Sequence, residues 1–290
     1  MQAPQRHQQV DRGPEPASAA IYPPLVIVVP ALGVEPAYYR PLCDAAGRQL
    51  GATVFMVPLP QARTLRERWL PTGEKLGFAA LVRAISDEAR RCRQTHPGRP
   101  MFLLGHSIGG QAGLLAAAAD PTAFDGVALV ACGTPYWHAW PRPQQRRTRL
   151  AIGVIDVVSA CLPWYPGRLV GFGGNQPRAL IRDWLLTAKT GSYAGIVGGA
   201  ALESKLREFR LPVLALRIDG DSYAPASAVE YLLHKCPRAH VTRALASSER
   251  LAAKKPDRRH VAWAREPEAV LPHLRRWMAE VTLLAANHSP

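Results

Sequence analysis

The sequence predicts an α/β fold built on a mostly parallel sheet with helices on both faces. Short apolar runs alternate with helical patterns along much of the 290 residues, which is the order expected of βαβ units. The apolar runs are continuous rather than alternating, as in strands buried on both faces of a parallel sheet. Between residues 134 and 209 this rhythm stops, which indicates an insertion into the sheet domain.

The first half of the sheet domain follows a tail. Residues 1–20 are rich in Gln, Pro and Arg, so they are expected to be disordered. Beyond them, continuous apolar runs predict strands, and the patterns between these runs predict helices, the first beginning near Pro36 and the second ending on basic residues. In chain order these are strand 25–29, helix 36–50, strand 53–59, helix 74–95, strand 101–104, helix 108–119 and strand 127–131.

Residues 134–209 are predicted to form a helical cap, or lid. The segment shows no clear strand pattern, is rich in Trp and Tyr, and has helical patterns at 150–162 and 178–189. The rhythm then returns with strand 213–218, helix 226–234, strand 241–246, a polar loop at 247–259 and an amphipathic helix at 267–284. The sheet domain is therefore expected to comprise residues 21–133 and 210–290.

The composition narrows the classes of function. A net charge of +14 favours anionic partners, although an Ala- and Arg-rich composition also produces it without one. The sequence contains no nucleic-acid-binding pattern and no apolar segment long enough to span a membrane. Five scattered cysteines without C-x-x-C spacing predict reduced thiols in a cytoplasmic protein and no metal site. The stretch Gly171–Gly174 follows no predicted strand, so it indicates a loop, and no cofactor is expected.

One motif carries most of the chemistry. A short apolar run ends in Gly105-His106-Ser107-Ile108-Gly109, and a helix of small residues follows at once. This Gly-x-Ser-x-Gly pattern between strand and helix is typical of a nucleophile elbow, a sharp turn that exposes the serine hydroxyl at a helix N-terminus. Ser107 is therefore predicted to be a nucleophile.

A nucleophilic serine needs a base, and the base needs an orienting carboxylate. In a sheet of this kind, the acid is expected after the strand at 213–218, where Asp219 and Asp221 both lie. Asp221 is preferred because it lies within the loop, whereas Asp219 is closer to the strand end. His260 is the predicted base because it follows the polar loop and precedes the final helix. His234, His240 and His273 lie on predicted helices or at a strand start.

The oxyanion that forms during attack needs two backbone N–H groups. Ile108 would supply one, because it follows the nucleophile at the helix N-terminus. Leu32 would supply the other from the turn after the strand at 25–29. An aromatic cap over the elbow would suit a hydrophobic substrate, and the candidate binding residues are Trp137, Trp164, Trp184 and Tyr193.

Taken together, these residues resemble the α/β-hydrolase superfamily from about residue 21 onward. More narrowly, the Pro-Ala-x-Gly-Val run at 30–34, Tyr38-Tyr39-Arg40, Gly-His-Ser-x-Gly-Gly-Gln and Tyr136-Trp137 are similar to uncharacterised bacterial hydrolases of the serine-aminopeptidase and monoacylglycerol-lipase-like group. Two departures are the short N-terminal region, which leaves little room for an opening hairpin, and an oxyanion loop without the common His-Gly start.

The resulting expectation is a serine hydrolase that cleaves a small-molecule ester or thioester with a hydrophobic acyl portion. One alternative is a thioesterase or acyltransferase acting on acyl groups carried by coenzyme A or an acidic carrier protein, which would use the basic surface. A second alternative is a non-catalytic protein that binds a hydrophobic ligand under the cap.

Overall fold

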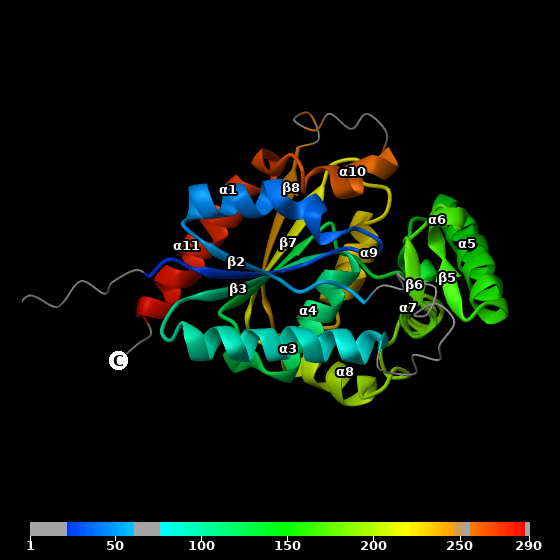
Figure 1. Cartoon of the computed structure of the whole chain (residues 1–290), viewed down its shortest axis with the longest axis horizontal. Coiled ribbons are helices and arrows are strands. Elements are labelled where there is room, and N and C mark those ends of the chain that lie inside the picture. The colour runs from blue at the N-terminus through cyan, green and yellow to red at the C-terminus, as the bar shows by residue number, and fades with distance from the viewer. Residues whose placement is uncertain (1–21, 61–75, 248, 250, 252–255, 288–290) are drawn as a thin grey trace, which may run out of the picture.

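The computed structural model describes residues 22–60, 76–247, 249, 251 and 256–287. Its six-stranded sheet has the order β2-β1-β3-β4-β7-β8, and every neighbouring pair is parallel (Figure 1). The strands are β1 (Leu25–Val29), β2 (Thr53–Met56), β3 (Met101–His106), β4 (Gly126–Val130), β7 (Pro212–Ile218) and β8 (His240–Ala246). The predicted α/β class with a mostly parallel sheet is confirmed.

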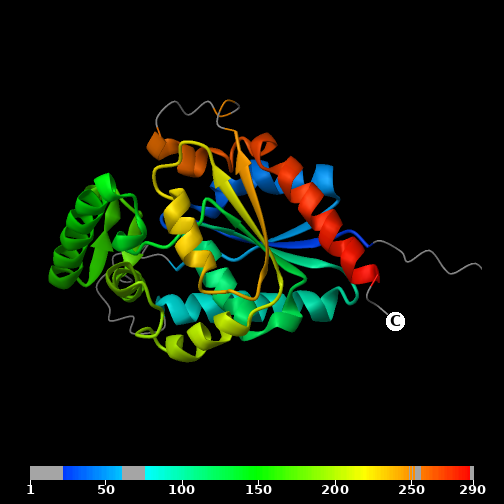
Figure 2. The same cartoon turned by 180° about the vertical axis from the view of Figure 1, so that it is seen from behind.

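Two helical layers cover the sheet, and the alternation of side chains along β1 shows how they are held. Leu25 and Ile27 pack into the core formed with α3 (Phe78–Thr95), α4 (Ile108–Ala119), α8 (Gly199–Glu208) and α9 (Ala226–Leu233). Val26 and Val28 point to the opposite face, toward α1 (Arg40–Leu50) and α11 (Leu271–Asn287). Figures 1 and 2 show these layers on opposite sides of the sheet.

The inserted segment leaves the sheet after β4 and returns at β7, which lie side by side. It contains α5 (Arg142–Cys161), β5 (Trp164–Pro166), α6 (Gly167–Val170), β6 (Asn175–Pro177) and α7 (Arg178–Thr190), which gather at one end of the molecule (Figure 1). Ile152, Ile155, Ile181 and Leu185 bury a small core of their own there, together with Tyr165.

The structure differs from the sequence expectation in the insertion. β5 and β6 form a two-stranded antiparallel sheet where no strand was expected. Three-residue strands are too short to show a period of two, and Pro ends both of them, which hides the signal. The helix α8 was also not predicted, and its Leu206 packs into the main core beside α4 rather than into the core of the insertion.

Several boundaries also shift. The helix expected at 36–50 begins as a 3-10 turn over Pro36–Tyr39, and the strand expected at 53–59 ends at Met56. The region expected as a polar loop through residue 259 includes a helix, α10 (Pro256–Ala262), so His260 lies on a helix. The tail at 1–20 and the start of the helix expected from residue 74 lie outside the described residues. Within the described residues, no helix is both long enough and apolar enough to cross a membrane.

Candidate active site

Ser107 occupies a sharp turn between β3 and α4. Its backbone has φ 54° and ψ −123°, which L side chains rarely adopt and which costs roughly 1–3 kcal/mol of strain. A Cβ on Gly105 would lie 2.3 Å from Cα of Gly110, and a Cβ on Gly109 would lie 2.4 Å from the carbonyl oxygen of Pro30. Only glycine fits at these two positions, so the motif folds as a turn that lifts Ser107 above the sheet edge.

Asp221 and His260 meet at the same end of the sheet. Nδ1 of His260 lies 2.8 Å from Oδ2 of Asp221, whose side chain is fully buried, while the His260 side chain is 11% exposed. The other carboxylate oxygen, Oδ1, accepts a hydrogen bond from the N–H of Tyr223 at 2.8 Å. Because Nδ1–H donates to the carboxylate, Nε2 of a neutral His260 is left as a proton acceptor.

The competing candidates lie elsewhere. Asp219 is exposed at the end of β7, and the carboxylate bonded to His260 is that of Asp221. Nδ1 of His234 lies 2.6 Å from the carbonyl oxygen of Glu230 on the same helix. His240 is exposed at the start of β8, and His273 lies on α11.

His260 lies beside the elbow. Its ring centroid is 4.9 Å from that of His106, the residue directly before Ser107. His106 is fully buried, and burial, followed by the charge of the neighbouring His260, holds the pKa of His106 well below its ordinary value. His106 is therefore neutral, and a buried imidazole with so low a pKa takes up a proton poorly.

Two backbone N–H groups belong to the elbow and to the turn after β1 that packs against it. Ile108 opens α4, and Leu32 follows β1 in the adjacent turn. The neighbouring N–H of Ala31 donates to the hydroxyl of Tyr39 at 2.8 Å and is therefore occupied. The N–H groups of Leu32 and Ile108 have no acceptor within the part of the chain that the structure describes. Both expected oxyanion donors are thus available for a bound oxygen.

The glycine-rich loop of the insertion lies against this turn. A Cβ on Gly33 would lie 2.3 Å from the carbonyl carbon of Gly173, and one on Gly173 would lie 2.8 Å from the Leu32 side chain. Phe172, in the same loop, stacks on Tyr223 with centroids 6.3 Å apart, and the Tyr223 ring is 5.3 Å from that of His260. The loop at 171–174 therefore touches the turn that carries Leu32 and reaches toward His260.

The aromatic residues expected to bind substrate have different surroundings. Trp184 packs against both the main core and the core of the insertion, and its ring is 5.4 Å from Phe172. Trp137 packs at the insertion, with the Arg149 guanidinium 5.3 Å from its ring centroid, and Trp164 is half-buried on β5.

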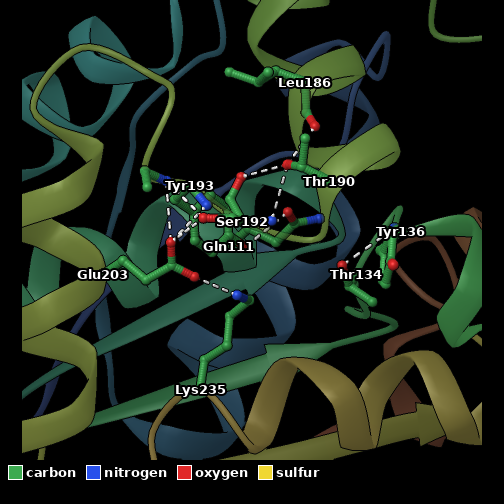
Figure 3. A network of polar contacts seen from close by, with 10 residues as sticks. Gln111, Thr134, Tyr136, Leu186, Thr190, Ser192, Tyr193, Glu203 and Lys235 are labelled. Atoms are coloured by element: carbon green, nitrogen blue, oxygen red, sulfur yellow. Dashed lines mark hydrogen bonds and ion pairs between the residues drawn. The ribbon is translucent and has the colours of Figure 1, made fainter.

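Tyr193 is a buried core residue. It is 1% exposed, and its hydroxyl donates to Oε1 of Gln111 on α4 at 3.0 Å. Figure 3 shows it beside Glu203, whose carboxylate accepts hydrogen bonds from Ser192 and from Lys235, the latter at 2.5 Å. These contacts tie the end of the insertion to the sheet domain, so the surroundings of Tyr193 are structural.

Sequence reasoning missed Phe172, Tyr223, His106, Tyr39 and Trp263 as residues around the site. Two of them lie within motifs that carry the family resemblance, Tyr39 in Tyr38-Tyr39-Arg40 and His106 in Gly-His-Ser-x-Gly-Gly-Gln. Among the described residues, no group of three or more His, Cys, Asp or Glu side chains is arranged to hold a metal ion.

Comparison with known proteins places this geometry in a family. Residues 72–248 match the model of a family described as serine aminopeptidase, S33. The human monoglyceride lipase is 39% identical over 81 residues, which are 28% of this chain and 26% of that enzyme. The rat monoglyceride lipase is 42% identical over 53 residues, 18% of each chain. The chain therefore aligns with about a quarter of the length of the human enzyme and with 18% of the length of the rat enzyme.

Solved structures show the same fold at low identity. One, from a report on the metagenome-derived lipolytic enzymes LipS and LipT, superposes with a TM-score of 0.57 and 15% identity, over 89% of this chain and 93% of that one. A peroxisomal alpha-beta-hydrolase from Saccharomyces cerevisiae has a TM-score of 0.55 and 13% identity, over 92% and 78%. Because the family match spans more than half of the chain, the protein belongs to the serine aminopeptidase S33 family of the α/β-hydrolase superfamily.

Proposed function

We propose that the protein is a serine hydrolase that cleaves carboxylic esters with a hydrophobic acyl portion, using Ser107, His260 and Asp221. The observation that carries the proposal is the buried hydrogen bond between His260 and Asp221, placed beside a serine in a strained elbow. The acid orients the imidazole, leaves Nε2 as the acceptor, and stabilises the imidazolium formed when His260 takes a proton.

The reaction follows from these positions. The Ser107 oxygen bonds to the ester carbonyl carbon while its proton passes to Nε2 of His260. The N–H groups of Leu32 and Ile108 stabilise the negative oxygen. The carbon–oxygen bond to the alcohol then breaks, and His260 returns the proton to that alcohol. Water, deprotonated by His260, attacks the acyl-enzyme, and the carboxylic acid leaves as Ser107 regains its proton.

The substrate class is inferred from the surroundings and from the relatives. The rings of Trp184, Phe172 and Tyr223 form a row that leads from the insertion to His260, with successive centroids 5.4, 6.3 and 5.3 Å apart. Such a row favours an apolar group near the base. The relatives include a monoglyceride lipase and lipolytic enzymes, which favours an oxygen ester over a thioester of coenzyme A or a carrier protein.

The test combines covalent labelling with a substrate panel. Wild type is expected to react with a fluorophosphonate probe and to hydrolyse monoacylglycerols and nitrophenyl esters, with acyl-coenzyme A and amino-acid anilides as comparison arms. Ser107→Ala and His260→Ala are each expected to lower kcat by roughly 10⁴- to 10⁶-fold. His234→Ala and Asp219→Asn are the matched controls and should retain activity, whereas Asp221→Asn should lose about 10⁴-fold.

Other results would favour other functions. Labelling of Ser107→Ala to the wild-type extent would overturn the nucleophile. A wild type that binds fatty acids without labelling or turnover would be a ligand-binding protein. An acyltransferase would divert product from the free acid to a new ester or thioester when alcohols or thiols are added.

A further inference from the structure

Three buried rings lie directly beneath the candidate site. Tyr39, His106 and Trp263 are each 0% exposed and come from segments far apart in the sequence. The His106 and Trp263 centroids are 4.9 Å apart, and Tyr39 lies 5.9 Å from His106 and 6.3 Å from Trp263. All three pairs meet edge to face, at 70° to 72°, which is a favourable aromatic geometry. The rings therefore form one rigid packing unit.

Hydrogen bonds tie this unit to three separate parts of the site. The hydroxyl of Tyr39 accepts the N–H of Ala31, next to the oxyanion donor Leu32, at 2.8 Å. The same hydroxyl lies 2.6 Å from Nδ1 of His106, which precedes the nucleophile. Nε1–H of Trp263 donates to the carbonyl oxygen of His260, the base, at 2.9 Å.

The direction of each proton follows from these partners. Within hydrogen-bond distance the Tyr39 oxygen meets the Ala31 N–H, which is a donor, and Nδ1 of His106, so Nδ1 is the acceptor available to its single proton. His106 is then the neutral tautomer with its proton on Nε2. The bridge from Ala31 through Tyr39 to His106 is thus a fixed, uncharged link between the oxyanion turn and the elbow.

We infer that Tyr39, His106 and Trp263 are positioning residues, which hold the oxyanion turn, the nucleophile and the base at fixed separations. The inference rests on the proposed function and extends it to residues that do not touch substrate. Tyr39 has the most specific role, because by engaging the Ala31 N–H it orients the next N–H, that of Leu32, toward the oxyanion.

The variant Tyr39→Phe tests this role, because it removes one oxygen atom and leaves the ring in place. We expect kcat, counted per fluorophosphonate-labelled site, to fall roughly 10- to 100-fold, with KM changed by less than about twofold. A trifluoromethyl ketone, whose hemiketal oxygen would occupy the oxyanion hole, should lose affinity by a similar factor. A purely structural role would reduce the number of labelled sites without changing kcat per site.

Tyr38→Phe is the matched control. Its half-buried ring lies 6.2 Å from that of Tyr39 on the same turn, and the loss of its hydroxyl should leave kcat and ketone affinity at wild-type values. Equal kinetics for Tyr39→Phe and wild type would overturn the inference, as would equal losses in both variants.

A structural readout keeps the test independent of turnover. Amide hydrogen exchange of Ala31 should be protected in wild type and fast in Tyr39→Phe, and the ¹⁵N shifts of His106 should report Nδ1 as the acceptor only when the hydroxyl is present. If wild type hydrolyses no ester, the proposed function fails, while these two measurements still decide the bridge. An unprotected Ala31 amide, or a proton on Nδ1 of His106, in wild type would overturn it.

Discussion

Gly33→Ala is expected to damage both stability and activity, because Gly33 is where the insertion meets the oxyanion turn. Its φ is +74°, and an added Cβ would lie 2.3 to 2.5 Å from backbone atoms of Gly173 and Gly174. The positive φ alone costs an alanine about 1–2 kcal/mol. Overlap with backbone, which cannot swing aside as a side chain can, adds about 1–3 kcal/mol. The expected loss in the free energy of unfolding is therefore about 2–5 kcal/mol.

Gly51→Ala separates the two contributions. Gly51 ends α1 with φ +64°, and an added Cβ would meet no atom within 4 Å. This control carries the conformational cost alone, so guanidinium unfolding should show a loss of about 1–2 kcal/mol, with kcat unchanged. In Gly33→Ala the displaced turn moves the Leu32 N–H, and kcat should fall by roughly 100-fold. Equal stability losses and equal kcat in the two variants would refute a close contact between the insertion and the oxyanion turn.

Three further predictions concern the side chains of Glu203 and His106 and the ring of Tyr223 beside His260. Glu203→Gln leaves the Lys235 ammonium, 12% exposed, without its counter-charge, so chemical unfolding should show a loss of about 3 kcal/mol. Burial would raise the pKa of Glu203, but hydrogen bonds from Lys235 and Ser192 outweigh it and hold that pKa below 4.5. The resulting contribution to the free energy of unfolding is complete above pH 4.5 and disappears as the pH falls further. Glu203→Gln should not show this dependence on pH. The pKa of His106 lies well below 6.5 because the side chain is buried, so below about pH 6.5 the unfolded chain binds a proton that the native state does not. The free energy of unfolding should therefore decrease as the pH is lowered below about 6.5, and it should decrease less steeply in His106→Gln. Tyr223→Ala should raise KM for long-chain esters about tenfold and for acetyl esters far less, because the 41% exposed ring borders His260; a uniform change across chain lengths would contradict the aromatic row.

The parallel sheet and the contact between Asp221 and His260 could be anticipated because both follow from local patterns. Continuous apolar runs mark strands buried on two faces, and the carboxyl ends of parallel strands share one edge. Residues placed just beyond β3 and β7 must therefore lie near one another. Asp221 is preferred over Asp219 for a separate reason: it lies within the loop and leads through Pro225 into the next helix, whereas Asp219 is closer to the strand end.

The supporting contacts could not be anticipated, because they join distant segments without a local signature. The contact between Tyr39 and His106 spans 67 residues, and Trp263 adds a third segment. The sequence predicts a glycine-rich loop at 171–174, but nothing in that segment indicates that it packs against Gly33. The helix that carries His260 was not predicted because the polar residues around it leave no apolar periodicity of a helix.

The contact between the insertion and the oxyanion turn also limits how this protein can be redesigned. Exchanging caps between enzymes of one fold is a direct way to change specificity, because loops and insertions tolerate substitution better than the sheet does. Here a transplanted cap would have to present two consecutive residues in the left-handed region, as Gly173 and Gly174 do at φ 73° and 64°. It would also have to bring its backbone as close to residue 33 as this one does. A chimera built without that pair would keep Ser107 and His260 and lose the position of the Leu32 N–H, the proposed oxyanion donor.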